Sequence, residues 1–188
     1  MDSFFISTGI VALAEMGDKT QLLAFMLAAK YRKTTPIILG ILVATLANHA
    51  AAGALGGWLS TLFSVETMRW ALGISFIAMA IWILIPDKLD DEQGALTHFG
   101  IFGTTLIAFF LAEMGDKTQI ATIALAAQYQ NIVAVVAGTT LGMMIANVPA
   151  VIFGEKITRN ISLSVVHGIA ALVFAVLGVI AIIGAITI

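Results

Sequence analysis

The nine residues LAEMGDKTQ (Leu13–Gln21) place two carboxylic acids and a lysine inside a strongly apolar segment. Ionisable groups at membrane depth cost free energy, and they usually mark a functional site. The same nine residues recur as Leu111–Gln119, again inside an apolar segment. The chain therefore carries two copies of one polar motif, and its fold must accommodate both.

The composition is that of a protein embedded in a lipid bilayer. Of the 188 residues, 60% are hydrophobic and only 11% are charged, whereas a soluble domain carries roughly a quarter charged residues. The absence of cysteine excludes disulfides, thiolate metal sites and cysteine nucleophiles. The first residues, MDSFF, lack the basic region of a secretory signal, so we expect no cleavable signal peptide.

Apolar segments of helical length predict an all-α integral membrane protein. A membrane-spanning helix needs about 20 mostly apolar residues, and six segments qualify: 3–29, 36–62, 68–85, 98–127, 132–153 and 163–188. The first would be roughly 40 Å long as one helix. That length exceeds the hydrocarbon thickness, so we expect the helix to tilt, bend or break. Gly17 and Gly115 mark the positions where a break is easiest.

Basic residues predict the orientation, because they concentrate in cytoplasmic loops. Six of them fall in the predicted loops 30–35, 86–97 and 154–162, namely Lys30, Arg32, Lys33, Lys88, Lys156 and Arg159. The opposite side holds only Arg69. We therefore predict that these three loops are cytoplasmic and that both termini lie outside.

The duplication extends beyond the motif. A shift of 98 residues also aligns Tyr31 with Tyr129 and Gly40 with Gly138. Each copy contains three predicted spans, and an odd number of spans makes the two copies antiparallel. We predict one repeat at residues 1–86, a short acidic cytoplasmic linker at 87–97, and a second, inverted repeat at 98–188. Secondary transporters often have this architecture, with the transport site near the bilayer midplane.

The motif supplies ligands for a hard cation. Residues three apart share a helix face, which pairs Glu15 with Asp18 and Glu113 with Asp116. A pseudo-two-fold axis would bring both pairs together. Further oxygen-bearing side chains follow in each motif: Thr20, Gln21, Thr118 and Gln119. Oxygen ligands of this kind suit Mg²⁺, Ca²⁺ or Mn²⁺.

The charge of the two motifs also points to a divalent cation. Four carboxylates with Lys19 and Lys117 sum to −2 when all are ionised, and one divalent cation would neutralise that charge. Without the metal, some of the acids should bind protons, because buried like charges are unfavourable. The site could thus exchange a metal for protons. Alternatively, the lysines pair with neighbouring acids and leave less charge for a metal, or the acid–lysine pairs only hold helices together.

Three more polar residues lie inside predicted spans. Asn48 and Asn147 could offer carbonyl oxygens to the metal or form hydrogen bonds between helices. His49 could bind the metal, carry a proton, or fill a packing role.

The pattern E-x-G-D-K-T, at Glu15–Thr20 and Glu113–Thr118, resembles the signature of the Gdt-type cation exchanger family. That family includes a Golgi Mn²⁺/Ca²⁺ transporter and bacterial MneA-like manganese exporters, and the resemblance covers the whole chain. It implies export of Mn²⁺ from the cytosol in exchange for protons, with the four motif acids as cation ligands. It also implies Ca²⁺ as an alternative substrate. The short length is similar to that of the bacterial members, which implies the bacterial plasma membrane.

Other functions fit the residues less well. An intramembrane enzyme such as a lipid phosphatase, with Glu15 or Glu113 as base, would need arginine or a phosphate-binding loop near the acids, and the sequence shows neither. A passive channel usually builds rings from several subunits. A metal sensor or a purely structural membrane protein remains an alternative. We expect no enzymatic activity, permanent cofactor or nucleic-acid partner; the expected partners are Mn²⁺ or Ca²⁺, protons and the lipid bilayer.

Overall fold

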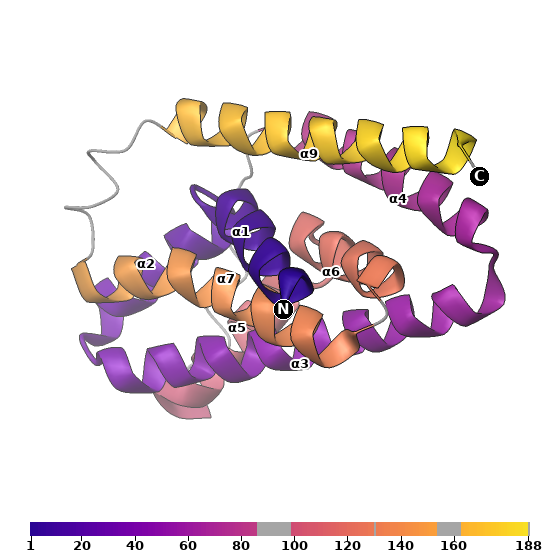
Figure 1. The fold of residues 1–188 in the computed structure, drawn as a ribbon. Helices are drawn as coiled ribbons and strands as arrows, with labels where there is room; N and C mark the ends of the chain where they lie inside the picture. Colours follow the sequence, from indigo (N-terminus) through magenta and orange to yellow (C-terminus); the bar gives the residue numbers. More distant parts are fainter. Residues whose placement is uncertain (86–98, 130, 154–162, 188) are drawn as a thin grey trace.

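In the computed structural model, which describes residues 1–85, 99–129, 131–153 and 163–187, the regular structure is helical (Figure 1). The first half contains α1 (Asp2–Glu15), α2 (Lys19–Tyr31), α3 (Thr34–Leu62) and α4 (Val65–Trp82). The second half contains α5 (Gly100–Glu113), α6 (Lys117–Tyr129), α7 (Ile132–Phe153) and α9 (Leu163–Ile186). The predicted linker 87–97 and the predicted loop 154–162 lie outside the described residues.

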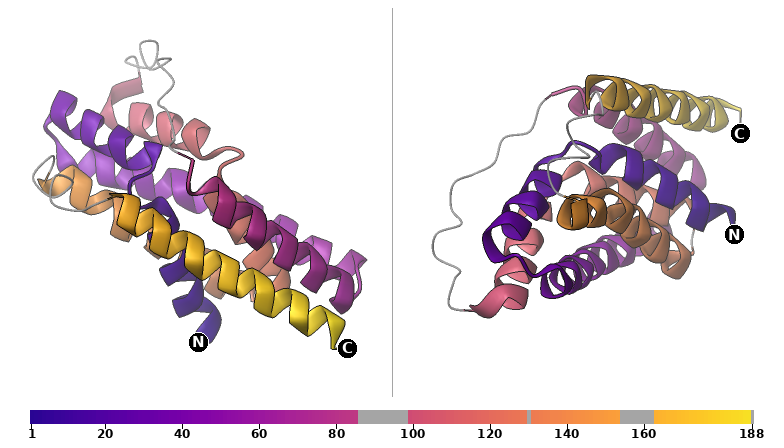
Figure 2. Two further views of the ribbon diagram at one scale, coloured as in Figure 1. Left: turned by 90° about the horizontal axis from the view of Figure 1, so that it is seen from above. Right: turned by 90° about the vertical axis from the view of Figure 1, so that its left-hand side faces the viewer.

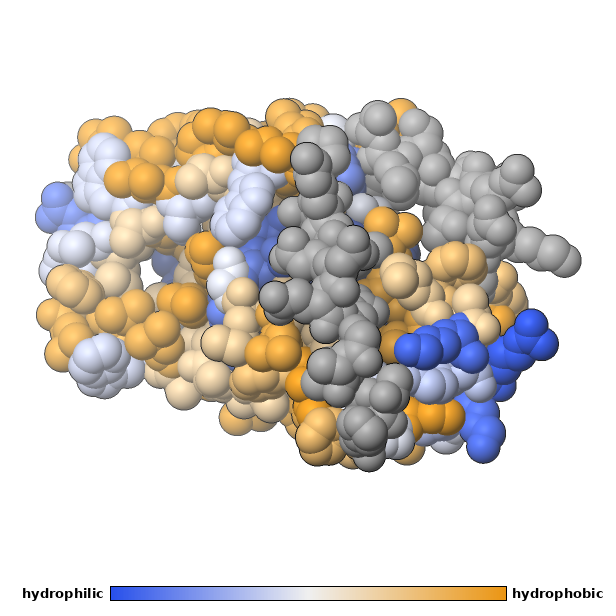
Figure 3. Space-filling view, turned by 180° about the vertical axis from the view of Figure 1, so that it is seen from behind, coloured by the Kyte–Doolittle hydropathy of each residue, from blue (hydrophilic) through white to orange (hydrophobic). Residues whose placement is uncertain are grey.

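Within the described residues, four helices are long and apolar enough to cross a membrane: α3, α4, α7 and the part of α9 from His167 to Ile186. Their outward faces carry large apolar side chains, such as Leu46, Ile74 and Leu172. The face in Figure 3 is mostly hydrophobic, with its strongest hydrophilic patch at one end. Such a surface fits contact with lipid, where helices satisfy their backbone hydrogen bonds internally.

The first and fourth predicted spans are each divided into two short helices. α1 and α5 have 14 residues each, and α2 and α6 have 13 each. A helix of that length extends about 20 Å, which is too short to cross a bilayer alone. The breaks lie at Gly17 and Gly115, where a break was expected.

Local signals explain where the neighbouring helices begin. Arg32 ends α2 in a left-handed conformation, φ 52°, and turns the chain into α3. Pro36 lies in the first turn of α3, where its missing N–H costs no helical hydrogen bond. Ser64 precedes α4, and its hydroxyl accepts a hydrogen bond from the Thr67 N–H at 3.2 Å, which is a typical N-cap.

The two halves interlock through contacts that occur twice. A Cβ added to Gly40 of α3 would lie 2.7 Å from Cβ of Thr105 in α5. A Cβ added to Gly138 of α7 would lie 3.1 Å from Cβ of Ser7 in α1. Gly138 and Thr105 follow Gly40 and Ser7 by 98 residues. Equivalent helices thus approach each other closely at equivalent glycines.

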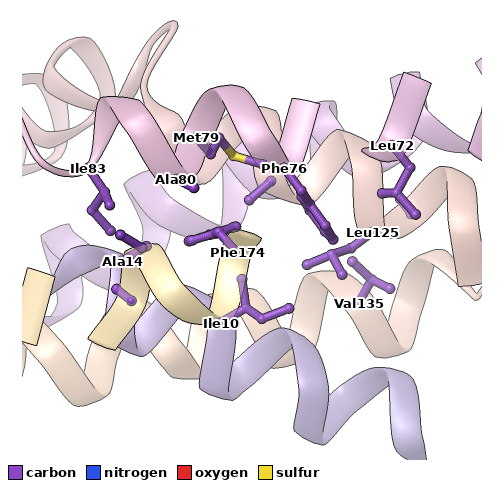
Figure 4. Close-up of a cluster of buried hydrophobic side chains, with 14 residues drawn as sticks. Ile10, Ala14, Leu72, Phe76, Met79, Ala80, Ile83, Leu125, Val135 and Phe174 are labelled. Atoms are coloured by element: carbon purple, nitrogen blue, oxygen red, sulfur yellow. The ribbon is translucent and has the colours of Figure 1, made fainter. Parts of the chain in front are cut away.

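Two apolar clusters flank the helix breaks. α4 and α9 pack together on one side of the molecule (Figures 1 and 2), where α4 also contacts α6 and α9 contacts α1. Figure 4 shows the cluster that these four helices form with Val135 of α7 (Ile132–Phe153). In it the rings of Phe76 and Phe174 meet edge to face with centroids 5.6 Å apart. The other cluster joins α2, α3, α5 and α7 around Leu23, Ile37 and Phe109. Because α1 and α6 belong to the first cluster and α2 and α5 to the second, both breaks lie between the clusters.

Candidate functional site

The break between α1 and α2 is a type II β-turn. Met16 has φ −62° and ψ 117°, and Gly17 has φ 84°. The turn closes with a hydrogen bond of 3.0 Å from the Asp18 N–H to the Glu15 carbonyl oxygen. A type II turn needs a positive φ at its third residue, which is why glycine follows methionine here.

The second motif forms the same turn. Met114 has φ −62° and ψ 119°, Gly115 has φ 75°, and the Asp116 N–H donates to the Glu113 carbonyl oxygen at 3.1 Å. The glutamate and the aspartate of each motif are therefore close because a turn joins them. The prediction that they share one helical face was wrong in this respect, since the helix ends between them.

The motif glutamines hold the turns. The Gln21 side-chain oxygen accepts a hydrogen bond from the Gly17 N–H at 3.0 Å, and the Gln119 oxygen accepts one from the Gly115 N–H at 2.8 Å. Gln21 Nε2 also donates to the Ala146 carbonyl oxygen of α7 at 2.9 Å. The glutamines thus satisfy backbone donors that the broken helices leave unpaired. Their predicted role as metal ligands stays a prediction.

The lysines of the two motifs form crossed ion pairs. Lys117 Nζ donates to Asp18 Oδ1 at 2.9 Å, and Lys19 Nζ lies 3.3 Å from Asp116 Oδ1. Each lysine contacts an aspartate of the other copy, so the structure brings the two motifs to one place. The alternative considered from the sequence was that each lysine pairs with a neighbouring acid. The observed partners instead come from the other motif.

Three buried carboxylates gather beside these pairs. Glu15, Glu113 and Asp116 each place a carboxylate oxygen within 4.8 Å of the other two, and these residues are at most 2% exposed. One oxygen of each carboxylate, Glu15 Oε2, Glu113 Oε1 and Asp116 Oδ2, has no hydrogen-bond partner within the described part of the chain. Buried polar atoms normally have partners, and a bound cation would supply one.

Asp18 is the one motif acid outside this group of three. The two glutamates instead accept hydrogen bonds from uncharged groups: Thr118 Oγ1 donates to Glu113 Oε2 at 2.8 Å, and Asn147 Nδ2 lies 3.4 Å from Glu15 Oε1. Both lysines lie opposite aspartates. When all six groups are ionised, the lysines balance the aspartates, so the net charge of −2 falls on the glutamates and matches one divalent cation.

The other polar residues have separate positions. Asn48 Nδ2 donates to the Phe110 carbonyl oxygen at 3.0 Å, which is a contact between α3 and α5. Asn147 is also anchored to Met143 O at 3.1 Å, and its buried carbonyl oxygen has no partner among the described residues. The same holds for the Thr20 hydroxyl and for both ring nitrogens of the fully buried His49. Asn147 is therefore the amide closest to the acid group by the contacts observed.

One contact at the first break was not predicted. His167 of α9 places Nε2 2.9 Å from the Met16 carbonyl oxygen. The available signal was a histidine in an otherwise apolar final span. Its counterpart after the 98-residue shift is Arg69, which donates to the Gly184 carbonyl oxygen at 2.7 Å instead. The two breaks thus differ in their surroundings, and Met114 at the second is 58% exposed.

Comparisons with known proteins identify a family and several relatives. The family model described as the divalent cation/proton antiporter GDT1 matches residues 3–91 and 101–188. A Vibrio cholerae protein named "Putative manganese exporter" is 50% identical over 175 residues, which cover 93% of this chain and 87% of the relative.

More distant relatives come from plants and cyanobacteria. GDT1-like protein 4 of Oryza sativa subsp. indica is 30% identical over 199 residues, with 92% of this chain and 70% of the relative covered. A GDT1-like protein of Synechocystis is 29% identical over 198 residues, with coverage of 91% and 92%. No solved structure matches the chain.

Proposed function

This chain belongs to the GDT1 family of divalent cation/proton antiporters, and from that premise we propose that it exports Mn²⁺ from the cytosol in exchange for protons. The family and the apolar helices make it an integral membrane protein, and the family is one of transporters rather than enzymes. The observation that carries the proposal is the group of three buried carboxylates from both motifs, each with an oxygen lacking a hydrogen-bond partner within the described residues.

The proposed architecture is six spans in two inverted repeats. α1 with α2 and α5 with α6 each form one broken span, and α3, α4, α7 and α9 form the other four. Two observations support it: helix starts recur after 98 residues, and the contacts at Gly40 and Gly138 are equivalent. With the basic loops in the cytoplasm, both termini lie outside the inner membrane of the bacterium.

The proposed ligands are carboxylate oxygens of Glu15, Glu113 and Asp116, with the carbonyl oxygen of Asn147 close by. The C-terminal ends of α1 and α5 point partial negative charge toward the two turns, and the N-terminal ends of α2 and α6 point partial positive charge there beside the aspartates. The carboxylates therefore supply the net charge that favours a cation. Oxygen ligands bind both Mn²⁺ and Ca²⁺. The name of the Vibrio cholerae relative favours Mn²⁺, and Ca²⁺ is the alternative substrate.

Proton exchange follows from the burial of the site. Two glutamates without a lysine opposite them within the described residues cannot both stay charged in an empty apolar site. They are neutralised either by one divalent cation or by protons, and the two occupancies exclude each other. A site that alternates between the two sides of the membrane then couples outward metal movement to inward proton movement.

Flux into proteoliposomes tests the proposal. With a pH-sensitive dye inside, Mn²⁺ uptake should acidify the outside and alkalinise the lumen, and Asp116→Asn should abolish both signals. Competition with Ca²⁺ ranks the two ions. Mn²⁺ flux that leaves the internal pH unchanged would contradict exchange with protons, and the absence of any divalent cation flux would contradict transport.

A further inference from the structure

We propose that Lys19 acts as a tethered cation: its ammonium pairs with Asp116 until Mn²⁺ displaces it. The ion pair of Lys117 with Asp18 instead persists and joins the two repeats. The inference rests on the proposed function, because it concerns entry of the transported ion. It assigns different roles to two residues that occupy equivalent positions in identical motifs.

The two crossed ion pairs have unequal surroundings. The Lys19 side chain is 25% exposed and lies 3.3 Å from Asp116. The Lys117 side chain is 3% exposed and lies 2.9 Å from Asp18. Both aspartates are buried, so the difference lies with the lysines. The Lys19 side chain has an exposed surface through which it can move, and the Lys117 side chain has almost none.

The two aspartates also differ in what surrounds them. Asp116 belongs to the group of three carboxylates, and Asp18 does not. Lys19 occupies Asp116 Oδ1, while Asp116 Oδ2 has no hydrogen-bond partner within the described residues. A divalent cation bound to this carboxylate would be repelled by an ammonium held on the same group. This repulsion favours withdrawal of Lys19 when the ion binds.

The chemistry of lysine allows that movement. Its ammonium is strongly hydrated and sits on a flexible four-carbon stem, so a partly exposed lysine regains hydration when it leaves its carboxylate. A buried ammonium such as that of Lys117 would instead lose its carboxylate without gaining water, which is strongly unfavourable. In the Lys19–Asp116 pair, Mn²⁺ can therefore replace the ammonium, whereas the buried Lys117–Asp18 pair stays intact.

Helix packing explains why the two lysines differ. α4 and α9 pack against α6 and α1, and α6 begins with Lys117. α2, which begins with Lys19, packs against α7, α5 and α3 instead. In the proposed orientation α2 runs from Lys19, at the break, to the cytoplasmic loop 30–35, so its exposed flank connects the site to the cytoplasmic side.

The tethered ammonium has two consequences for transport. It balances the charge of Asp116 while no metal is bound. It also sets a threshold for entry, since a monovalent ion offers the carboxylates no more charge than the ammonium it must replace. A divalent ion offers twice that charge, and Coulomb attraction scales with it.

Chemical labelling tests the displacement directly. The purified protein is treated with an acetylating reagent for amines, with and without Mn²⁺, and each lysine is quantified by mass spectrometry while Mn²⁺ binding is measured on the same sample. Mn²⁺ should raise the labelling of Lys19 several-fold. The exposed Lys30 serves as the control and should not change, and Lys117 should stay poorly labelled.

Substitutions give an independent measure. Lys19→Gln should lower the Mn²⁺ concentration for half-maximal flux by about fivefold, the effect of removing one partly exposed ion pair, while Lys19→Arg should not lower it. Lys117→Gln, the matched control, should lower thermal stability instead.

The outcomes separate this inference from the proposed function. Bound Mn²⁺ without increased labelling of Lys19, or weaker Mn²⁺ affinity in Lys19→Gln, would overturn the tethered cation and leave the transporter intact. A wild-type protein that binds no Mn²⁺ would overturn both.

Discussion

Lys117 Nζ of the second motif lies 2.9 Å from Asp18 Oδ1 of the first, and both side chains are at most 3% exposed. The equivalent contact between Lys19 and Asp116 joins the motifs a second time. The two copies are thus bonded crosswise, and the lysine of each motif has a physical role that neither copy reveals alone.

The two aspartates should respond differently to loss of charge. Asp18→Asn removes the carboxylate opposite a buried ammonium, and such a change typically costs about 3–5 kcal/mol. Asp116→Asn affects a pair whose lysine is 25% exposed, so we expect a loss of stability of about 1 kcal/mol or less. Thermal unfolding in detergent measures both. The double variant Asp18→Asn/Lys117→Gln should recover part of the loss, and equal losses in the two single variants would contradict this account.

The turn at the second break should require glycine for conformational reasons alone. Gly115 has φ +75°, and an added Cβ would meet nothing within 4 Å. Gly115→Ala should therefore cost about 1–2 kcal/mol through backbone strain without a steric clash. The matched control is Gly9→Ala in α1, where space is also open and alanine should stabilise the helix by about 0.5–1 kcal/mol. If both variants unfold at the same temperature, strain at Gly115 is not part of the fold.

Much of this arrangement is predictable from the sequence. The duplicated motif and its glycines indicate two breaks, and the excess length of the first apolar segment explains why a break is needed. The crossed pairing of the lysines is not predictable, because it depends on how α2 and α6 are placed across the interface. The placement of these helices also separates Asp18 from the other three acids, and sequence spacing does not reveal it. Asp18 therefore has a structural role as the partner of Lys117 that the motif alone does not reveal.

The contact between His167 and the Met16 carbonyl oxygen could not be predicted from the sequence either. Residues 151 positions apart meet only through packing of α9 on α1. A lone histidine in an apolar span is a weak signal, since many such residues only satisfy a backbone carbonyl. That is the contact observed here.

Exchange should be electrically neutral. The two lysines lie opposite the two aspartates, so the glutamates carry the charge that either Mn²⁺ or protons must balance. Two protons per Mn²⁺ follow from this count. Proteoliposomes with a potassium gradient and valinomycin should show Mn²⁺ flux that is independent of the imposed membrane potential. A flux that rises steeply with inside-negative potential would contradict the stoichiometry.

Cysteine pairs can report alternating access, because the chain contains no native cysteine. Leu72 and Leu125 belong to the same apolar cluster, so Leu72→Cys/Leu125→Cys should cross-link in the state described here. The positions related by 98 residues are Ala170 and Leu27, which belong to different clusters. If the repeats exchange conformations, Leu27→Cys/Ala170→Cys should cross-link in the opposite state.

Each cross-link should stop transport, and reduction should restore it where a disulfide is used. The opposite result is a Leu27→Cys/Ala170→Cys variant that transports Mn²⁺ but never cross-links. It would show that the two repeats do not exchange conformations through movement of α4 and α9.

The central claim is that one cation binds between the two motifs. An anomalous difference map at the manganese absorption edge, from crystals grown with Mn²⁺, locates the ion directly. We predict one peak about 2.0–2.5 Å from carboxylate oxygens of Glu15, Glu113 and Asp116, with Lys19 withdrawn from Asp116. A peak elsewhere, with these three carboxylates free of metal, would contradict the account.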